Sequence, residues 1–170
     1  LEDLGRLPAP SREKGTVTAG NASGVNDGSA ALIIATEQAA KENGLQCLAR
    51  ISAMASAGVA PRIMGIGPVP ASRKLMDHLD LRIDDFDVIE INEAFAAQVL
   101  AVIREFGLED SAEHVNRNGG AISLGHPLGA SGARLVGTAV RMLSEGGHKR
   151  ALCTMCIGVG QGIAIALDAA

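Results

Sequence analysis

Three short segments of this chain carry side chains suited to chemistry, and each lies among small residues. Asn92-Glu93-Ala94-Phe95 supplies an amide, Gly125-His126-Pro127 an imidazole, and Cys156-Ile157-Gly158-Val159-Gly160 a thiol. A thiol and an imidazole can exchange protons, and an amide or a backbone N–H can stabilise an oxyanion. The small residues let the reacting carbon of a substrate come close to the backbone. The set therefore indicates a site for proton transfer.

Cys156 has two interpretations. A lone cysteine is most often a small buried hydrophobic residue. This one stands at the end of an expected strand and precedes Gly158 and Gly160, where a side chain can face a cleft. A thiol with a pKa near the ordinary value of about 8.5 suits a proton shuttle if a neighbour favours the thiolate.

The spacing Cys153-x-x-Cys156 also suggests a redox or zinc motif. Residues three apart on a strand face opposite sides of the sheet, so these thiols are not expected to meet. No second Cys/His pair at zinc spacing accompanies them in the sequence. Gly158-x-Gly160-x-Gly162 similarly resembles a dinucleotide loop, but it lies between two expected strands with no helix after it. We therefore expect neither a metal nor a prosthetic group.

His126 lies between Gly125 and Pro127, at the start of an expected helix over 129–143. A lone histidine is more often a structural group than a catalyst. Here the positive end of the helix dipole disfavours the imidazolium, so a neutral imidazole is expected, able to accept a thiol proton or donate to an oxyanion. The other histidines have polar sequence surroundings and are expected at the surface: His78, His114 and His148.

Asn92 stands where a helix N-cap is expected, because a helical pattern follows from Glu93 to about Phe106. From these residues alone, capping is the better interpretation of the amide. Glu93 has two equally weighted interpretations: it orients its neighbours, or it simply complements the helix dipole.

Composition limits the class of protein. The chain has 170 residues, of which 47% are hydrophobic and 20% charged, which fits a globular domain with its own core. Its net charge of −4 provides no basic field for nucleic acid or an anionic membrane surface. No apolar run approaches the roughly 20 residues that span a bilayer, and Leu1-Glu2-Asp3-Leu4 does not resemble a signal peptide. Three cysteines without an export signal indicate a reducing compartment, the cytoplasm.

The order of the expected elements is that of an α/β protein. Residues 1–25 have prolines, charges and a Gly/Ser/Asn-rich run without periodicity, which predicts an extended connector. Asn26-Asp27 offers an N-cap for an alanine-rich helix that ends at about Asn43, before Gly44. Strands then alternate with helices and end in a hairpin, which predicts a layered domain. The further expected elements are strands over 48–57 and 86–91, helices over 71–79, 93–106 and 129–143, a glycine-rich loop over 118–127, and a hairpin of strands over 151–157 and 161–167.

Five motifs occur in an order that resembles the thiolase family. They are residues 16–24, residues 65–71 and the Asn-Glu-Ala-Phe, Gly-His-Pro and Cys-x-Gly segments described above. The chain resembles the C-terminal half of a thiolase, and residues 58–62 and 152–156 look most like the β-ketoadipyl-CoA branch. The resemblance implies a thiolase-like α/β fold: an αβα layered C-terminal domain over 26–170, whose mixed sheet ends in a β-hairpin, after the tail of a loop domain over 1–25.

The resemblance also implies roles for the candidate residues. Cys156 would exchange a proton with the α-carbon of the second acyl-CoA, and the N–H of Gly158 would contribute to an oxyanion hole. His126 would activate the nucleophile and polarise the second thioester carbonyl, while the Asn92 amide would hold a water in the second oxyanion hole. The residues that match the pantetheine channel are Ser23, Ala94 and Phe95, although Ser23 equally fits a loop serine and Phe95 a core residue.

By the same resemblance, the activity is thiolytic cleavage or Claisen condensation of a 3-oxoacyl-CoA, with coenzyme A as a substrate and no cofactor. The β-ketoadipyl-CoA branch yields succinyl-CoA and acetyl-CoA in aromatic-acid catabolism. The nucleophilic cysteine of thiolases lies in an N-terminal half that this sequence does not contain, so the chain alone is expected to be inactive. Expected partners are that half and further copies, as a dimer or tetramer.

Two alternatives stay open, an acetoacetyl-CoA thiolase and a non-catalytic acyl-CoA-binding relative. Acyl-chain selectivity in the family depends largely on the other half, and a pure binder needs no proton shuttle. A nucleotide-binding α/β domain is disfavoured, because its best candidate loop, residues 124–129, carries no P-loop lysine.

Overall fold

The computed structural model describes residues 2–170, and a four-stranded sheet organises residues 49–169. Its strands are β1 (Ala49–Gly58), β2 (Val88–Ile91), β3 (Arg150–Ile157) and β4 (Gln161–Ala169), in the order β1-β4-β3-β2. β4 pairs antiparallel with both β3 and β1, whereas β2 runs parallel to β3. The predicted α/β class, with a mixed sheet ending in a hairpin, is confirmed.

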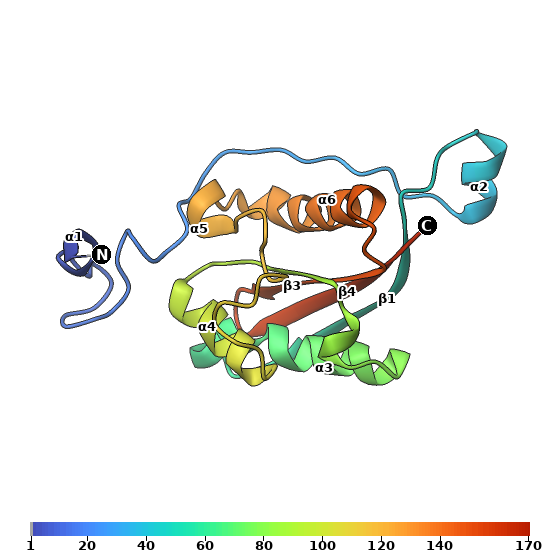
Figure 1. Ribbon diagram of the computed structural model, residues 1–170. Helices are drawn as coiled ribbons and strands as arrows, with labels where there is room; N and C mark the ends of the chain where they lie inside the picture. Colours follow the sequence, from blue (N-terminus) through green and yellow to red (C-terminus); the bar gives the residue numbers. More distant parts are fainter. Residues whose placement is uncertain (1) are drawn as a thin grey trace.

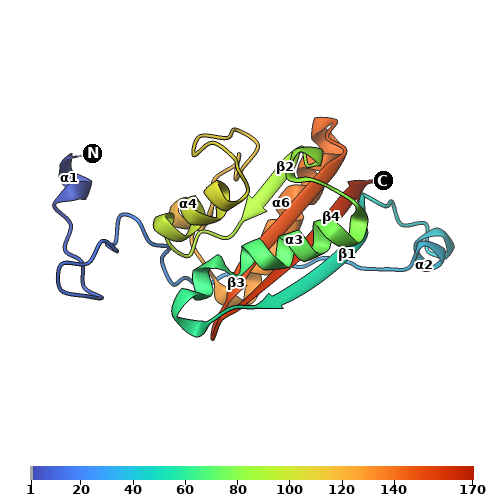
Figure 2. The same ribbon diagram turned by 90° about the horizontal axis from the view of Figure 1, so that it is seen from below.

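Helices cover both faces of this sheet and make it the middle of three layers (Figure 1). α6 (Leu128–Gly146) lies on one face, and α3 (Pro68–Leu79) and α4 (Ala96–Glu105) lie on the other. Figure 2, seen from below, shows α3 lying over the sheet and running roughly along β1. Shorter helical turns connect these elements: α5 (Ala121–Leu124), η1 (Pro61–Ile66) and η2 (Ile83–Asp85).

Each face of the sheet has its own apolar core. The core beneath α3 and α4 includes Leu75, Ile89, Val102 and Leu152. The core beneath α6 includes Val88, Leu135, Ala139 and Leu167. Burial on both faces explains why β2 does not alternate apolar and polar residues: all four of its residues are buried, and all but Glu90 are apolar.

Glycines bring backbone segments close together at two places in the body. A Cβ on Gly162 of β4 would lie 2.0 Å from the carbonyl oxygen of Gly67, which precedes α3. At the tip of the hairpin, Gly160 has a φ of +89°, and a Cβ there would lie 2.3 Å from the carbonyl oxygen of Val59. The carbonyl oxygen of Gly160 accepts a hydrogen bond from the Val59 N–H at 2.8 Å, so the hairpin turn is held against the chain that follows β1.

Residues 2–48 form an arm outside the layered body, and none of these described residues is buried. The arm contains α1 (Glu2–Gly5) and α2 (Glu37–Glu42). Between them, residues 26–35 have no regular secondary structure and run along the outer side of α6 (Figure 1). Leu32 reaches the surface of α6, where a Cβ on Gly137 would lie 3.8 Å from its Cδ2.

The predicted helix over 26–43 is wrong for residues 26–36. The helix α2 begins only at Glu37, with Thr36 as its N-cap. The expected cap, Asn26, instead accepts a hydrogen bond from the backbone N–H of His126 at 3.1 Å. Val25 also forms a bridge with His126, so the chain enters this segment held in an extended conformation. The predicted end at Asn43 is confirmed.

The other predicted strands and helices are confirmed within a few residues at their ends, whereas the extended connector predicted over 1–25 contains the short helix α1. The loop over 118–127 contains the short helix α5, which the sequence did not predict. Among the described residues, no helix is both long enough and apolar enough to cross a membrane.

Candidate active site

The carboxyl ends of β2 and β3 bring two of the predicted segments to one edge of the sheet. These strands are parallel, with Ile91 beside Thr154. Asn92 directly follows β2, and its backbone N–H donates to the carbonyl oxygen of Thr154 at 3.0 Å. Cys156 lies two residues farther along β3, so the amide and the thiol belong to the same edge.

Asn92 and His126 are in contact at this edge. Nδ2 of Asn92 lies 3.4 Å from Nε2 of His126, and Asn92 is fully buried. Its Oδ1 is buried and has no hydrogen-bond partner among residues 2–170, so one acceptor of this amide is unused. Residues that are 34 positions apart in the chain thus become neighbours.

Ser131, in the first turn of α6, fixes the tautomer of His126. Its Oγ lies 2.6 Å from Nδ1 of His126 and 3.0 Å from the carbonyl oxygen of Pro127. The hydroxyl donates its one proton to this carbonyl oxygen, and the amide nitrogen of Asn92, which can only donate, faces Nε2. The hydroxyl therefore accepts from Nδ1–H. The hydrogen-bond network thus assigns the lone pair of the imidazole to Nε2, the nitrogen that faces Asn92.

The environment of His126 keeps its ring neutral. Burial lowers the pKa of His126, and the positive charge of Arg134 lowers it further. Both causes disfavour the imidazolium. The neutral imidazole agrees with the prediction, although desolvation and a nearby guanidinium, rather than the helix dipole alone, account for it.

Cys156 is buried, with 8% of its surface exposed. Burial raises the pKa of its thiol, and a backbone hydrogen bond opposes the rise. The thiol is therefore protonated near neutral pH, which departs from the near-ordinary pKa that the sequence led us to expect. Cys153 faces the opposite side, with its Sγ 3.7 Å from the carbonyl oxygen of Leu135 in α6. Both thiols are free, which confirms that they do not pair.

Gly158 opens the turn between β3 and β4, and it is exposed. A Cβ at this position would meet no atom within 4 Å, so the backbone here faces open space. The turn continues through Val159, whose φ is +67°, a left-handed conformation that a β-branched residue rarely adopts. This turn leaves Gly158 accessible at the end of the strand that bears Cys156.

The arm passes between the loop after β2 and the loop before α6. Ser23 donates both its backbone N–H and its hydroxyl to the carbonyl oxygen of Ala94, at 3.1 and 3.2 Å. The next residue, Gly24, accepts a hydrogen bond from the backbone N–H of His126 at 3.1 Å. The structure thus brings Ser23 and Ala94 together and ties the arm to both loops.

The N-cap of α4 is Phe95, so the prediction that Asn92 caps this helix is wrong. Phe95 has an extended backbone and forms an antiparallel bridge with Ala22 of the arm. This bridge keeps the chain extended beyond Glu93, where the helix was expected to begin. Phe95 is 38% exposed, so the alternative interpretation of it as a core residue is also wrong.

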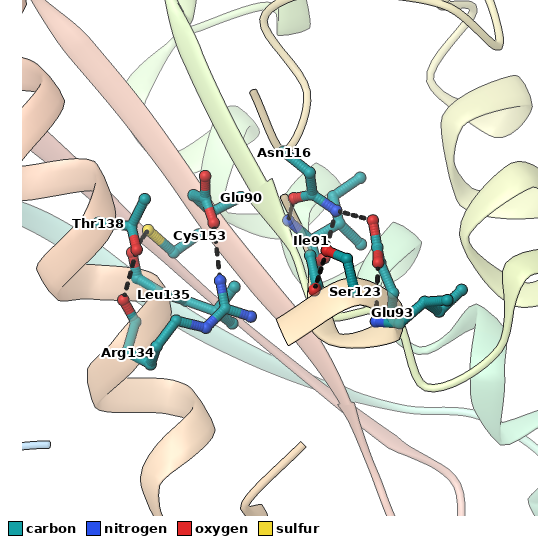
Figure 3. A network of polar contacts seen from close by, with 11 residues as sticks. Glu90, Ile91, Glu93, Asn116, Ser123, Arg134, Leu135, Thr138 and Cys153 are labelled. Atoms are coloured by element: carbon teal, nitrogen blue, oxygen red, sulfur yellow. Dashed lines mark hydrogen bonds and ion pairs between the residues drawn. The ribbon is translucent and has the colours of Figure 1, made fainter. Parts of the chain in front are cut away.

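Glu90, two residues before Asn92 on β2, forms an ion pair with Arg134 (Figure 3). Oε2 of Glu90 is 3.1 Å from Nη1 of Arg134 in α6, and Glu90 is fully buried. Burial raises the pKa of Glu90 to about 7, and attraction to Arg134 opposes the rise. The pair connects the middle of β2 with α6. His126 lies just before this helix, and Ser131 lies in its first turn.

Three polar residues near the site were not predicted: Ser131, Arg134 and Asn116. A signal existed for the first two, which lie on one side of α6 five and eight residues after His126. The carboxylate of Glu90 within an apolar strand also required a partner. Asn116 contacts β2 from 25 residues away, and no local pattern marks it.

Two family models match the chain. The model described as "Thiolase, C-terminal domain" matches residues 45–169, which include the whole layered body and the edge that carries Asn92, His126 and Cys156. The chain belongs to the thiolase family. The model described as "Thiolase, N-terminal domain" matches residues 1–38, most of the arm of this thiolase chain.

Similar proteins confirm the resemblance and the thiolase-like fold. The "Beta-ketoadipyl-CoA thiolase" of Pseudomonas knackmussii is 64% identical over 168 residues, which are 99% of this chain and 42% of that relative. The crystal structure of the Bacillus anthracis acetyl-CoA acetyltransferase has a TM-score of 0.94 at 48% identity, and human mitochondrial 3-ketoacyl-CoA thiolase in complex with CoA has a TM-score of 0.91 at 46%. Each match covers 99% of this chain and 42% of the solved chain. The chain thus spans less than half the length of these relatives.

Proposed function

We propose that this chain supplies the proton-transfer residues of a thiolase that acts on 3-oxoadipyl-CoA. The reaction is the thiolytic cleavage of 3-oxoadipyl-CoA by CoA to succinyl-CoA and acetyl-CoA, or the reverse Claisen condensation. The observation that carries the proposal is the contact between Asn92 and His126 at the sheet edge that also bears Cys156. The 64% identity to a β-ketoadipyl-CoA thiolase supports the choice of substrate.

His126 acts as the base toward the nucleophile in this proposal. Its Nε2 lone pair is available because Nδ1–H is bound to Ser131, and burial keeps the ring unprotonated. It accepts the proton of the nucleophilic cysteine that the rest of the enzyme supplies. The Nε2–H formed by this proton transfer then donates to the second thioester carbonyl oxygen, and the neighbouring Asn92 amide holds the water of the second oxyanion hole.

Cys156 acts as the acid and base toward the α-carbon. When the bond between the α-carbon and the 3-oxo carbon breaks, the protonated thiol gives its proton to the α-carbon of acetyl-CoA. In the condensing direction the thiolate removes that proton. A raised pKa makes this thiolate a stronger base, which suits a weakly acidic C–H. The Gly158 N–H, on the accessible turn beside it, donates to the thioester oxygen.

The other parts of the proposal concern binding and assembly. Ser23, Ala94 and Phe95 line the pantetheine channel, and the half-exposed ring of Phe95 supplies an apolar surface for it. Residues 1–25 belong to the loop domain that covers CoA. The whole enzyme is a homo-oligomer of a reducing compartment, the cytoplasm, where its thiols stay free, and it serves aromatic-acid catabolism.

The test joins residues 1–170 to the N-terminal portion of a β-ketoadipyl-CoA thiolase relative, so that a nucleophilic cysteine is present; we call this protein the joined enzyme. We expect it to release succinyl-CoA and acetyl-CoA from 3-oxoadipyl-CoA and CoA. Cys156→Ala should keep acyl-enzyme formation, seen by intact-protein mass spectrometry, and lose about 10²- to 10⁴-fold in turnover. The exposed Cys47 provides a matched control, and Cys47→Ala should change nothing. Unimpaired turnover in Cys156→Ala overturns the assignment.

A second candidate substrate is acetoacetyl-CoA. It is favoured by the TM-score of 0.94 to an acetyl-CoA acetyltransferase. Because selectivity depends largely on the other half, the ratio of kcat/KM for the two substrates is compared between two joined enzymes, one with the N-terminal portion of a β-ketoadipyl-CoA thiolase and one with that of an acetyl-CoA acetyltransferase. The preference that both joined enzymes share is the one that this chain sets. A joined enzyme that binds CoA but turns over neither substrate would instead be a non-catalytic relative.

A further inference from the structure

The short segment 114–116 runs beside β2 on its outer edge and then turns away. The Ile89 N–H donates to the carbonyl oxygen of His114 at 2.9 Å, and the Asn116 N–H donates to the carbonyl oxygen of Ile89, also at 2.9 Å. Val115 forms a parallel bridge with Ile89 between them. At Asn116 the backbone φ is +47°, which ends the pairing; asparagine tolerates this left-handed conformation better than most residues.

The side chain of Asn116 continues the pairing that its backbone abandons (Figure 3). Its Oδ1 accepts from the Ile91 N–H at 2.8 Å, and its Nδ2 donates to the Ile91 carbonyl oxygen at 2.9 Å. The second proton of Nδ2 goes to Oε1 of Glu93 at 2.8 Å. Both donors and the oxygen of the amide are therefore used, which fixes its orientation.

The carboxylate of Glu93 carries the connection on to the loop before His126. Its Oε2 accepts a hydrogen bond from the backbone N–H of Ile122 in α5 at 3.1 Å. Gly120 lies against the same carboxylate, where a Cβ would come within 2.0 Å of it, so only glycine leaves room. The side chains of Asn116 and Glu93 thus connect Ile91 of β2 with Ile122 in the loop before His126.

We propose that Asn116 and Glu93 are positioning residues, a clamp that sets the Asn92 amide and the His126 ring at their working separation. Ile91, held by Asn116, directly precedes Asn92, whose own N–H is held by Thr154 on the other side. Ile122, held by Glu93, lies four residues before His126. The clamp acts through these neighbours. This inference rests on the proposed function for its effect on turnover.

The test reverses the polarity of the clamp in the joined enzyme. In Asn116→Asp, two carboxylates face each other at the contact between residues 116 and 93, and the donor to Ile91 is lost. Adding Glu93→Gln restores a donor–acceptor pair and the parental net charge, because the Gln amide donates to the new aspartate while its oxygen still accepts from Ile122. Asn118→Asp is the control: it makes the same change two residues along the same loop, at an exposed position.

We expect Asn116→Asp to lower kcat by about 10- to 100-fold, the scale expected for small misplacements of reacting groups. KM for the acyl-CoA should stay within about twofold, since the clamp acts on the catalytic groups rather than on uniform binding. The double variant should recover most of the lost kcat, and Asn118→Asp should match the parent. The pH titration of the His126 ring, followed by NMR, should shift in Asn116→Asp and return in the double variant.

Three results would overturn the clamp: a kcat for Asn116→Asp within twofold of the parent, a double variant no better than Asn116→Asp, or an equal loss in Asn118→Asp. Failure of the proposed function is a separate outcome, in which the parental joined enzyme turns over no 3-oxoacyl-CoA. The NMR titration then decides about the clamp. An unchanged His126 titration in Asn116→Asp refutes it, and a shift that the double variant reverses supports it.

Discussion

The arm and the layered body both contain large aliphatic side chains, but they bury them very differently. In the body, Leu75 and Leu152 are fully buried on one face of the sheet, whereas in the arm Ile33 and Ile34 are 85% and 75% exposed. The arm nevertheless touches the site, where Ser23 and Gly24 bond to the two loops at the sheet edge. The stability of this chain therefore lies in the body, while the arm contributes contacts to the site.

Ion pairs should show this difference most strongly. Arg134→Met removes the partner of the buried Glu90 and should lower the free energy of unfolding by about 3–5 kcal/mol at pH 8, where the carboxylate is charged. Lys41→Met removes the partner of Glu37 in the arm, where both side chains are more than two-thirds exposed, and should cost less than about 0.5 kcal/mol. Urea unfolding of the 170-residue chain, followed by circular dichroism, measures both. Equal losses would refute the contrast.

Truncation of aliphatic side chains tests the same contrast without charge. Leu152→Ala leaves a cavity between the sheet and α3 and should lower the free energy of unfolding by about 2–5 kcal/mol. Ile33→Ala, at an exposed arm position, should change it by less than about 0.5 kcal/mol. The two variants are compared in the same urea experiment. A large loss in Ile33→Ala would show that the arm is packed in solution.

The buried carboxyl of Glu90 should give the body a recognisable pH dependence. Its pKa is raised from 4.5 to about 7 by burial, so the folded state holds this proton more tightly than the unfolded state does. Its contribution to stability is complete below about pH 4.5 and is lost as the pH rises through about 7, a change of about 3 kcal/mol. The free energy of unfolding, measured between pH 4 and 8, should therefore depend less on pH in Glu90→Gln than in the parent. A parental slope retained in that variant would contradict the assignment.

The smallest effect is expected at the junction of arm and body. Asn26→Ala removes one of the two acceptors of the His126 N–H and leaves the carbonyl oxygen of Gly24. We expect the hydrogen exchange of this N–H, measured by NMR, to accelerate by less than about tenfold, the scale of one exposed hydrogen bond. Asn43→Ala is the matched control, because it removes a side-chain bond to Ala39 within the arm alone. Identical exchange in Asn26→Ala and Asn43→Ala would show that Asn26 does not hold the loop.

The elements of the body could be predicted because local pattern and tertiary burial agree there. β3 is a mostly buried run, β4 largely alternates buried and more exposed residues, and a glycine-rich turn separates them; α6 follows a helical pattern of small and apolar residues that ends in glycine. The helix predicted to start at Asn26 does not form there, because the local pattern and the tertiary contacts disagree. Its alanine-rich composition favours a helix, but Val25 and Asn26 at its start bond to His126 instead, and only residues Glu37–Glu42 are helical.

The candidate site shows the same division. Asn92, His126 and Cys156 were identifiable because each lies in a short motif of small residues. The capping role of Asn92 was a reasonable local inference, and it is wrong because the bridge between Ala22 and Phe95 keeps the chain extended. Asn116 had no local signal at all, since its partners belong to a strand 25 residues earlier.

By itself, the sequence determined the alternation of strands and helices, the family, and the presence of an amide, an imidazole and a thiol in short motifs. These features depend on residue types at short spacings. The tertiary structure alone decided which atoms face each other. It placed Asn92 beside His126, gave the ring its tautomer through Ser131, and raised the pKa of the Cys156 thiol by burying it. Tautomers, pKa shifts and contacts depend on distances between residues far apart in the chain, and packing fixes those distances.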